Sequence, residues 1–224
     1  MKFKDVYKVG LYAPSYPTLV LKLMKTHQYP TVILLFLFSI AVLAEDTKER
    51  HSLKQTTKGD ILYSRFTFYF LKEQHTSTNY RMGTLIPINS KFEFVKTSWP
   101  KRLNKPPFQV PGSFRIKHVE SGQIIKIENI KKYSGSGVSG YFLKMFSKDK
   151  TDLFSFTEKE RQYILIGRVL SEMSKKGVIL ALGYPPVHKT PSLNNPIWHY
   201  WNSKLGTFTV QFLDDKTIEL NSIK

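Results

Sequence analysis

The part of the chain richest in residues able to recognise a ligand is the segment 183–201, GYPPVHKTPSLNNPIWHYW. It combines two histidines, two tyrosines and two tryptophans on a backbone stiffened by four prolines. Tyr and Trp dominate binding hot spots because they bury large areas at a small cost in side-chain entropy. The segment therefore predicts a partner-binding patch. Its candidate residues are Tyr184, His188, Trp198, His199, Tyr200 and Trp201.

The alternative is that some of these rings belong to the core. Alternation along a strand places Trp198 and Tyr200 on one face and His199 and Trp201 on the other. We therefore expect one pair to be buried and the other to be partly exposed. The core alternative applies more strongly to Trp198 and Tyr200 than to Trp201.

Catalytic and metal-binding patterns are weaker. No G-x-S-x-G elbow occurs, and the neighbouring carboxylates Asp214 and Asp215 are typical of a hairpin turn. His188 and His199 have no partner at the spacing of a zinc site and no second carboxylate nearby. Cysteine is absent, which excludes a disulfide framework and a thiol nucleophile. We expect a non-enzymatic protein with no catalytic residue, metal or cofactor.

Charge is the next constraint. The formal net charge of +17 predicts attraction to polyanions such as lipopolysaccharide, anionic lipid headgroups, cell-wall polymers or nucleic acid. The alternative is a lysine-rich surface that only confers solubility. Basic residues concentrate in KTSWPKRLNK at 96–105 and in the doublets Lys131-Lys132 and Lys175-Lys176. The candidate polyanion-binding residues are Lys96, Lys101, Arg102, Lys105, Lys131 and Lys132.

The start of the chain has the pattern of a targeting signal. Residues 31–44, TVILLFLFSIAVLA, form an uncharged run of 14 residues that follows basic residues and precedes Glu45. This is the profile of a signal peptide, and it is shorter than the ~20 residues that span a bilayer. We expect residues 1–44 to act as a signal peptide, with Met24 as an alternative start, and the protein to be periplasmic or secreted. An uncleaved N-terminal anchor is the alternative. Lipid attachment through a lipobox cysteine is excluded, because the sequence has no cysteine.

The N-terminal half of the remaining chain has a β-rich pattern. Residues 45–59 are polar and are expected to be a flexible lead-in. Residues 60–132 alternate apolar and polar positions between turn residues, which predicts a small antiparallel barrel or curled sheet. The phrase RMGTLIPINSKFEFV, with Gly83 and Pro87 before a strand, resembles an SH3-like barrel. The expected strands are 61–70, 83–88, 91–96, 113–118 and 123–130.

A glycine- and serine-rich segment follows. Residues 133–141, YSGSGVSGY, lack the Lys-Ser/Thr pair of a phosphate-binding loop. Their composition is typical of a flexible connection. We predict a linker over residues 133–150 that separates two domains.

Residues 151–224 predict an α+β domain of two layers. Thr157 and Glu160 form a capping-box pattern that begins one helix. Ser174 caps a second helix, which Gly183 ends. Three alternating segments then predict an antiparallel meander packed on the helices. These segments are 197–201, 207–213 and 217–223.

This order resembles the SmpA/OmlA family of BamE-like envelope domains over residues 160–224. The resemblance rests on MSKKGVILALGYPP at 173–186, WHYW at 198–201 and FTVQFLDDKTIELNSI at 208–223. Glu172 stands where the family usually has glycine, and the lipid-bearing cysteine of its outer-membrane members is missing. The resemblance implies two short helices on a three-stranded sheet, and a role as an accessory factor in outer membrane assembly.

The expected function is that of an exported envelope accessory protein. It would bind an envelope protein or an anionic cell-surface polymer, with peripheral membrane association and no nucleic-acid partner. An inhibitor or immunity-type protein that blocks a secreted enzyme is the alternative, because BamE-like architecture is similar to that of such inhibitors. A cell-wall hydrolase with an unrecognised site is the third hypothesis.

Overall fold

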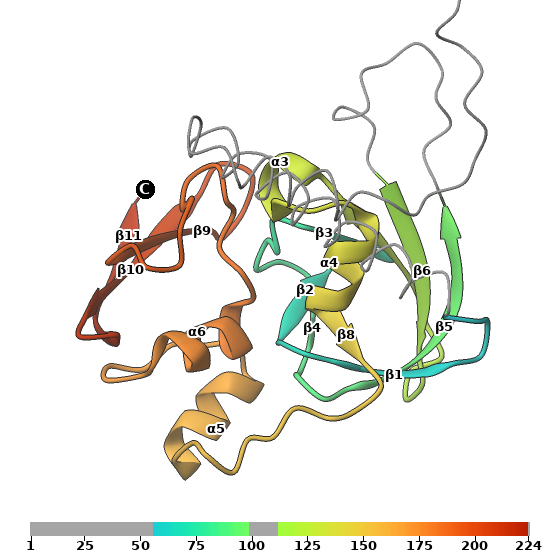
Figure 1. Ribbon diagram of the computed structural model, residues 1–224, viewed down its shortest axis with the longest axis horizontal. Coiled ribbons are helices and arrows are strands. Elements are labelled where there is room, and N and C mark those ends of the chain that lie inside the picture. The colour runs from blue at the N-terminus through green and yellow to red at the C-terminus, as the bar shows by residue number, and fades with distance from the viewer. Residues whose placement is uncertain (1–55, 99–111, 224) are drawn as a thin grey trace, which may run out of the picture. The chain divides into compact units, whose positions relative to one another are not determined.

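The computed structural model describes residues 56–98 and 112–223, with backbone alone for residues 219–223 (Figure 1). The expected signal peptide, most of the lead-in and the basic residues Lys101, Arg102 and Lys105 lie outside this part of the chain. Residues Lys48–Lys224 form one compact unit. Among the described residues, no helix has the length and apolar character to cross a membrane. The described protein is mixed α+β, with several sheets and short helices, in agreement with the expected class.

The largest sheet has six strands in the order β3-β7-β6-β5-β1-β8. All neighbours pair antiparallel except β3 and β7, which are parallel. The curled sheet fits a small barrel only loosely, because its hydrogen-bonded order ends at β3 and β8. The strands are β1 (Ile61–Ser64), β3 (Gln74–Thr76), β5 (Lys91–Ser98), β6 (Gly112–His118), β7 (Ile124–Asn129) and β8 (Phe146–Ser147).

The strand expected over residues 61–70 is broken in two. After β1, Arg65 N donates a hydrogen bond to Met145 O, and β2 (Phe68–Phe70) pairs with β4 (Thr84–Ile86) in a separate two-stranded sheet. The short strand β3 was also not anticipated. Alternation nevertheless fills the core as expected, because Phe92, Phe94, Phe114 and Ile116 are all buried.

The predicted linker is wrong. Residues 133–150 contain the end of α3 (Lys131–Ser134), the whole of α4 (Val138–Met145) and strand β8. Six of the eight residues of α4 are buried, and Tyr141, Phe142 and Met145 pack into the core of the six-stranded sheet. The small residues of this segment allow close packing and do not make the backbone flexible. A Cβ on Gly135, for example, would lie only 2.9 Å from the Val187 side chain.

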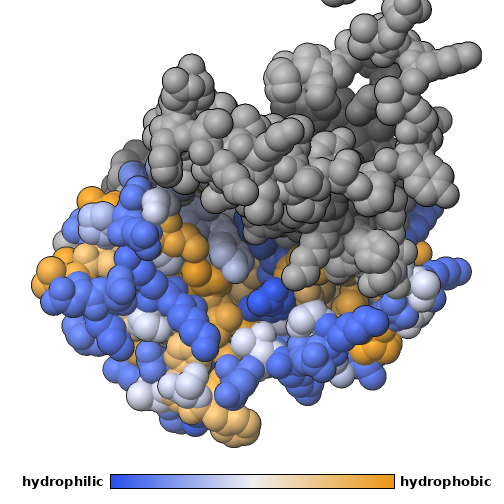
Figure 2. Space-filling model, viewed as in Figure 1, coloured by the Kyte–Doolittle hydropathy of each residue, from blue (hydrophilic) through white to orange (hydrophobic). Residues whose placement is uncertain are grey.

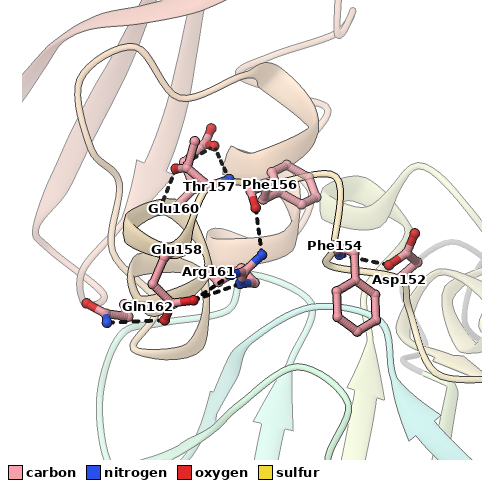
Figure 3. A network of polar contacts seen from close by, with 8 residues as sticks. All are labelled: Asp152, Phe154, Phe156, Thr157, Glu158, Glu160, Arg161 and Gln162. Atoms are coloured by element: carbon pink, nitrogen blue, oxygen red, sulfur yellow. Dashed lines mark hydrogen bonds and ion pairs between the residues drawn. The ribbon is translucent and has the colours of Figure 1, made fainter.

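The C-terminal elements agree with expectation. Helix α5 (Glu158–Leu165) begins at a complete capping box, in which Thr157 Oγ1 accepts from Glu160 N while the Glu160 carboxylate accepts from Thr157 N (Figure 3). Helix α6 (Lys175–Leu182) is capped by Ser174 and ends at Gly183. The meander consists of β9 (Ile197–Trp201), β10 (Thr207–Leu213) and β11 (Lys216–Ile223).

These helices and strands share a second core. Ile164 of α5 and Val178 and Leu182 of α6 join Trp198 and Val210 of the sheet in one buried cluster. Figure 1 shows α6 next to the three-stranded sheet, with α5 beyond α6.

Buried hydrogen bonds connect the two cores. Thr67 N donates to Leu180 O at 2.9 Å, and Thr67 Oγ1 donates to Ile164 O at 2.7 Å. Asn79 Nδ2 donates to Leu182 O at 2.7 Å. Because the carbonyls of α5 and α6 find their partners on the β-rich part, residues 60–150 and 151–223 are joined directly.

Candidate binding surface

The aromatic residues of β9 divide as alternation requires. Trp198 is 0% exposed and Tyr200 is 4% exposed, and both belong to the second core. Tyr200 Oη donates a hydrogen bond to Gly183 O at 3.1 Å, and burial raises the pKa of Tyr200 well above its ordinary value. The core alternative therefore holds for these two rings, which leaves them outside any exposed patch. His199 and Trp201, on the opposite face, are half-buried.

Three aromatic side chains from distant parts of the sequence meet at the surface. The rings of His188 and Trp201 stack with centroids 5.1 Å apart at an angle of 18°. Tyr133 of α3 lies 5.0 Å from the His188 ring and 6.0 Å from the Trp201 ring. We call Tyr133, His188 and Trp201 the aromatic triad.

Backbone contacts hold the triad in place. Val187 N donates to Tyr133 O at 2.9 Å, which fixes the residue before His188 against α3. On the other side, the buried Thr190 Oγ1 accepts from His199 N at 2.9 Å, which ties the loop to β9. The loop that carries His188 is thus fixed to α3 on one side and to β9 on the other.

Three exposed lysines flank the triad. Lys131 and Lys132 precede Tyr133 on α3, and Lys189 follows His188. Desolvation lowers the pKa of His188 below its ordinary value, and the charges of Lys132 and Lys189 lower it further. A neutral imidazole is therefore favoured at neutral pH, which preserves its ring as a stacking surface. We call the triad with Lys131, Lys132 and Lys189 the aromatic–lysine surface.

The other candidates lie elsewhere. Lys96 is on β5, where its register partner is Arg115 of β6, so the two cations lie side by side on the six-stranded sheet. Tyr184 is half-buried in an edge contact with Phe66, with ring centroids 6.3 Å apart, and Lys144 Nζ lies 5.3 Å from its ring centre. The predicted residues that converge on one surface are therefore His188, Trp201, Lys131 and Lys132.

Comparison with known proteins gives no relative. No family model, no curated protein and no solved structure matches the chain. The chemistry of the site is therefore inferred from its own geometry.

One serine–histidine pair was not anticipated from the sequence. His118 Nδ1 lies 2.9 Å from Ser121 Oγ, beside a pocket of about 380 Å³. His118 Nε2 is buried and has no hydrogen-bond partner among the described residues, whereas a catalytic triad requires an acid there. Ser121 Oγ also accepts from Gln123 N at 3.4 Å, so the pair stabilises the β6–β7 turn.

Residues able to bind a metal ion are dispersed in the described part of the chain. Within residues 56–98 and 112–223, no group of three or more His, Asp or Glu side chains is arranged to hold a metal ion. The aromatic–lysine surface is a candidate for recognition of a partner.

The surface combines two kinds of interaction. Exposed ring faces stack on planar or apolar faces of a ligand at a low cost in side-chain entropy. Lysines attract anionic groups over several ångströms and tolerate variation in their position. Sequence reasoning missed Tyr133 because its segment was assigned to a linker, although an aromatic residue directly after Lys131 and Lys132 was the available signal.

Proposed function

We propose that this chain is an exported, non-catalytic envelope protein that binds an anionic, sugar-containing polymer of the cell surface. The observation that carries the proposal is the stacking of His188 on Trp201, with Tyr133 beside them and three lysines around them. Ring faces suit the apolar faces of sugars, and lysines suit phosphate or carboxylate substituents. The net charge of +17 adds long-range attraction to such a polymer.

Export is part of the proposal. It rests on the uncharged run of residues 31–44, which has the length and flanking charges of a signal peptide. A periplasmic or secreted location would place the protein next to the envelope polymers that it is proposed to bind.

We also propose a BamE-like assignment for the C-terminal region. The order α5, α6 and then β9–β11 supports it. A local detail adds support, because Glu172, at the position where that family usually has glycine, adopts a φ of +66°. Glycine reaches that region without steric cost. For the curled sheet, an SH3-like relationship is supported only by its small size and its loose fit to a barrel.

Capture from fractionated cells tests the class of partner. The purified protein is incubated with isolated lipopolysaccharide, with cell-wall material and with a soluble envelope extract, and bound material is recovered by sedimentation or pull-down. Retention on one of the two polymers, with little captured from the soluble extract, is the expected result. Recovery of one soluble enzyme would support an inhibitor. A parallel pull-down from detergent-solubilised envelope that recovers a membrane protein complex would support an accessory protein. Either outcome, without polymer binding, contradicts the proposal.

A matched pair of variants locates the site. Trp201→Ala should reduce retention about tenfold, because loss of one stacking platform removes about 1–3 kcal/mol of binding free energy. Phe154→Ala is the control, because Phe154 is 91% exposed and is not part of the aromatic–lysine surface. Equal losses in the two variants would show that exposed aromatic character, not this surface, causes retention.

Sequencing the mature N-terminus from cells tests export, with a first residue at or after position 45 expected.

A further inference from the structure

A second site lies in a groove of about 440 Å³ that is separate from the aromatic–lysine surface. Its walls come from α6, the end of α4, strand β9 and the loops before β9 and after β1. The volume is within the range of ligand pockets for small molecules. The lining residues that determine its chemistry are Arg65, Lys144, Lys175, Lys176, Tyr184 and Trp198.

Positive charge is in excess in this groove. The four basic residues face one acidic lining residue, Asp215, whose Oδ1 lies 2.8 Å from Lys175 Nζ. Of the other cations, Arg65 Nη1 donates to the neutral Leu143 O at 2.7 Å, and Lys176 Nζ lies 5.5 Å from the ring centre of Phe156. A net surplus of cationic groups around a concave site favours an anionic ligand.

An independent observation points to the same groove. Trp198 lines it, and the indole Nε1–H of Trp198 is buried without an acceptor among the described residues. A buried donor left unsatisfied costs about 1–3 kcal/mol, so native proteins rarely retain one without a reason. Because Trp198 is 0% exposed, its indole is an internal reporter of the groove and not a direct contact of a ligand.

Apart from Thr151 and Asn194, the remaining walls are apolar. Phe66, Ile179, Leu180 and Leu193 line the groove together with the ring of Tyr184. The face drawn in Figure 2 shows a comparable mixture, with a hydrophobic strip between hydrophilic residues. An inorganic anion has no apolar part that could pack against these walls.

We propose that the groove binds a small organic anion in which a phosphate or carboxylate group is attached to an apolar ring or short chain. Arg65 and Lys176 bind the acidic group, and Tyr184 packs against the apolar part. This site uses none of the residues of the aromatic–lysine surface, so it does not depend on the proposed function.

Three probes separate the parts of the proposal. Phenyl phosphate carries both the anion and the ring, inorganic phosphate only the anion, and benzyl alcohol only the ring. Binding is followed by NMR through the indole N–H signals of Trp99, Trp198 and Trp201, which the variants Trp99→Phe and Trp201→Phe assign. Phenyl phosphate should shift the Trp198 signal saturably and bind at least tenfold more tightly than either other probe.

Surface variants keep the test independent of folding. Arg65→Gln and Lys176→Gln should each weaken phenyl phosphate about tenfold, which is the loss of one charge-assisted hydrogen bond. Lys159→Gln, an exposed lysine outside the groove, is the matched control and should leave affinity unchanged. An unmoved Trp198 signal, equal affinity for inorganic phosphate, or equal weakening by Lys159→Gln would overturn the proposal.

Discussion

His75 of β3 and Tyr141 of α4 are joined by a hydrogen bond of 2.9 Å between the imidazole Nε2 and the phenol oxygen. His75 Nδ1 lies 2.7 Å from the carbonyl oxygen of Tyr69, which can only accept, so Nδ1 carries the hydrogen. The neutral imidazole then accepts from the Tyr141 hydroxyl at Nε2. This pair links the edge of the six-stranded sheet to the helix that replaces the expected linker.

The first prediction concerns pH. Burial lowers the pKa of His75 from 6.5 to about 4, with the Tyr69 carbonyl opposing the shift. Below pH 6.5 the unfolded chain gains a proton that the folded chain does not, so stability falls as pH falls towards 4. The free energy of unfolding should drop by about 2 kcal/mol between pH 7 and 5, above the range in which most carboxylates titrate.

Urea denaturation at closely spaced pH values measures this loss. The variant His188→Asn is the comparison: the pKa of His188 is also lowered, but its side chain is exposed, so its removal should change the profile only slightly. A free energy of unfolding that is constant from pH 7 to 5 would contradict a neutral, buried His75.

The second prediction concerns the connection between the two cores. Thr67 Oγ1 donates to Ile164 O at 2.7 Å and accepts from Ile88 N at 3.0 Å, and Thr67 is 0% exposed. Thr67→Val keeps the shape but leaves both partners unsatisfied, so the free energy of unfolding should fall by about 2–4 kcal/mol. Thr84→Val, at an exposed position on β4, should change it by less than about 0.5 kcal/mol. Similar losses in the two variants, measured by thermal and urea unfolding, would argue against this connection.

The third prediction compares two glycines with left-handed backbone. Gly83 has a φ of +87°, and an added Cβ would lie 2.2 Å from Phe70 O. Gly122 has a φ of +70° but nothing within 4 Å of an added Cβ. Gly122→Ala should cost about 1–2 kcal/mol from backbone strain alone, while Gly83→Ala should cost clearly more because backbone must also move. Equal costs would show that the pairing of β2 with β4 does not require this close approach.

The fourth prediction concerns Glu172. Its φ of +66° is strained for any residue with a Cβ, and its side chain is exposed. Glu172→Gly should raise the free energy of unfolding by up to about 1 kcal/mol, after the entropy that glycine adds to the unfolded chain. Glu93→Gly, in the interior of β5, should instead lower it by about 1 kcal/mol. A loss of stability in Glu172→Gly would remove one support for the BamE-like assignment.

Elements that depend on local chemistry were predictable from the sequence. The capping box of Thr157 and Glu160 and the cap at Ser174 act within one turn of their helices, and both form as expected. Alternation in β9 and β10 likewise needs only adjacent residues. It correctly separated the buried Trp198 and Tyr200 from the half-exposed Trp201.

The errors arose where distant partners decide the structure. The chain breaks after β1 because Arg65 N and Thr67 N find acceptors at Met145 and Leu180, far along the sequence. The Gly- and Ser-rich segment is ordered because α4 packs into the sheet core and Gly135 lies against Val187. Tyr133 reaches the triad through the same packing, so composition alone could not place it in the site.

The most direct test of the aromatic–lysine surface is the binding of dextran sulfate, compared with neutral dextran and with polyglutamate, at 0.05 M and 0.5 M salt. Dextran sulfate, which has both sugar rings and charge, should bind most tightly and weaken strongly as salt shortens the Debye length. The variant in which Lys131, Lys132 and Lys189 are all changed to Gln should lose most of this affinity and its salt dependence. The control variant with Lys58, Lys91 and Lys159 changed to Gln should retain both. Equal losses in the two variants, or equally tight binding of polyglutamate, would contradict the account.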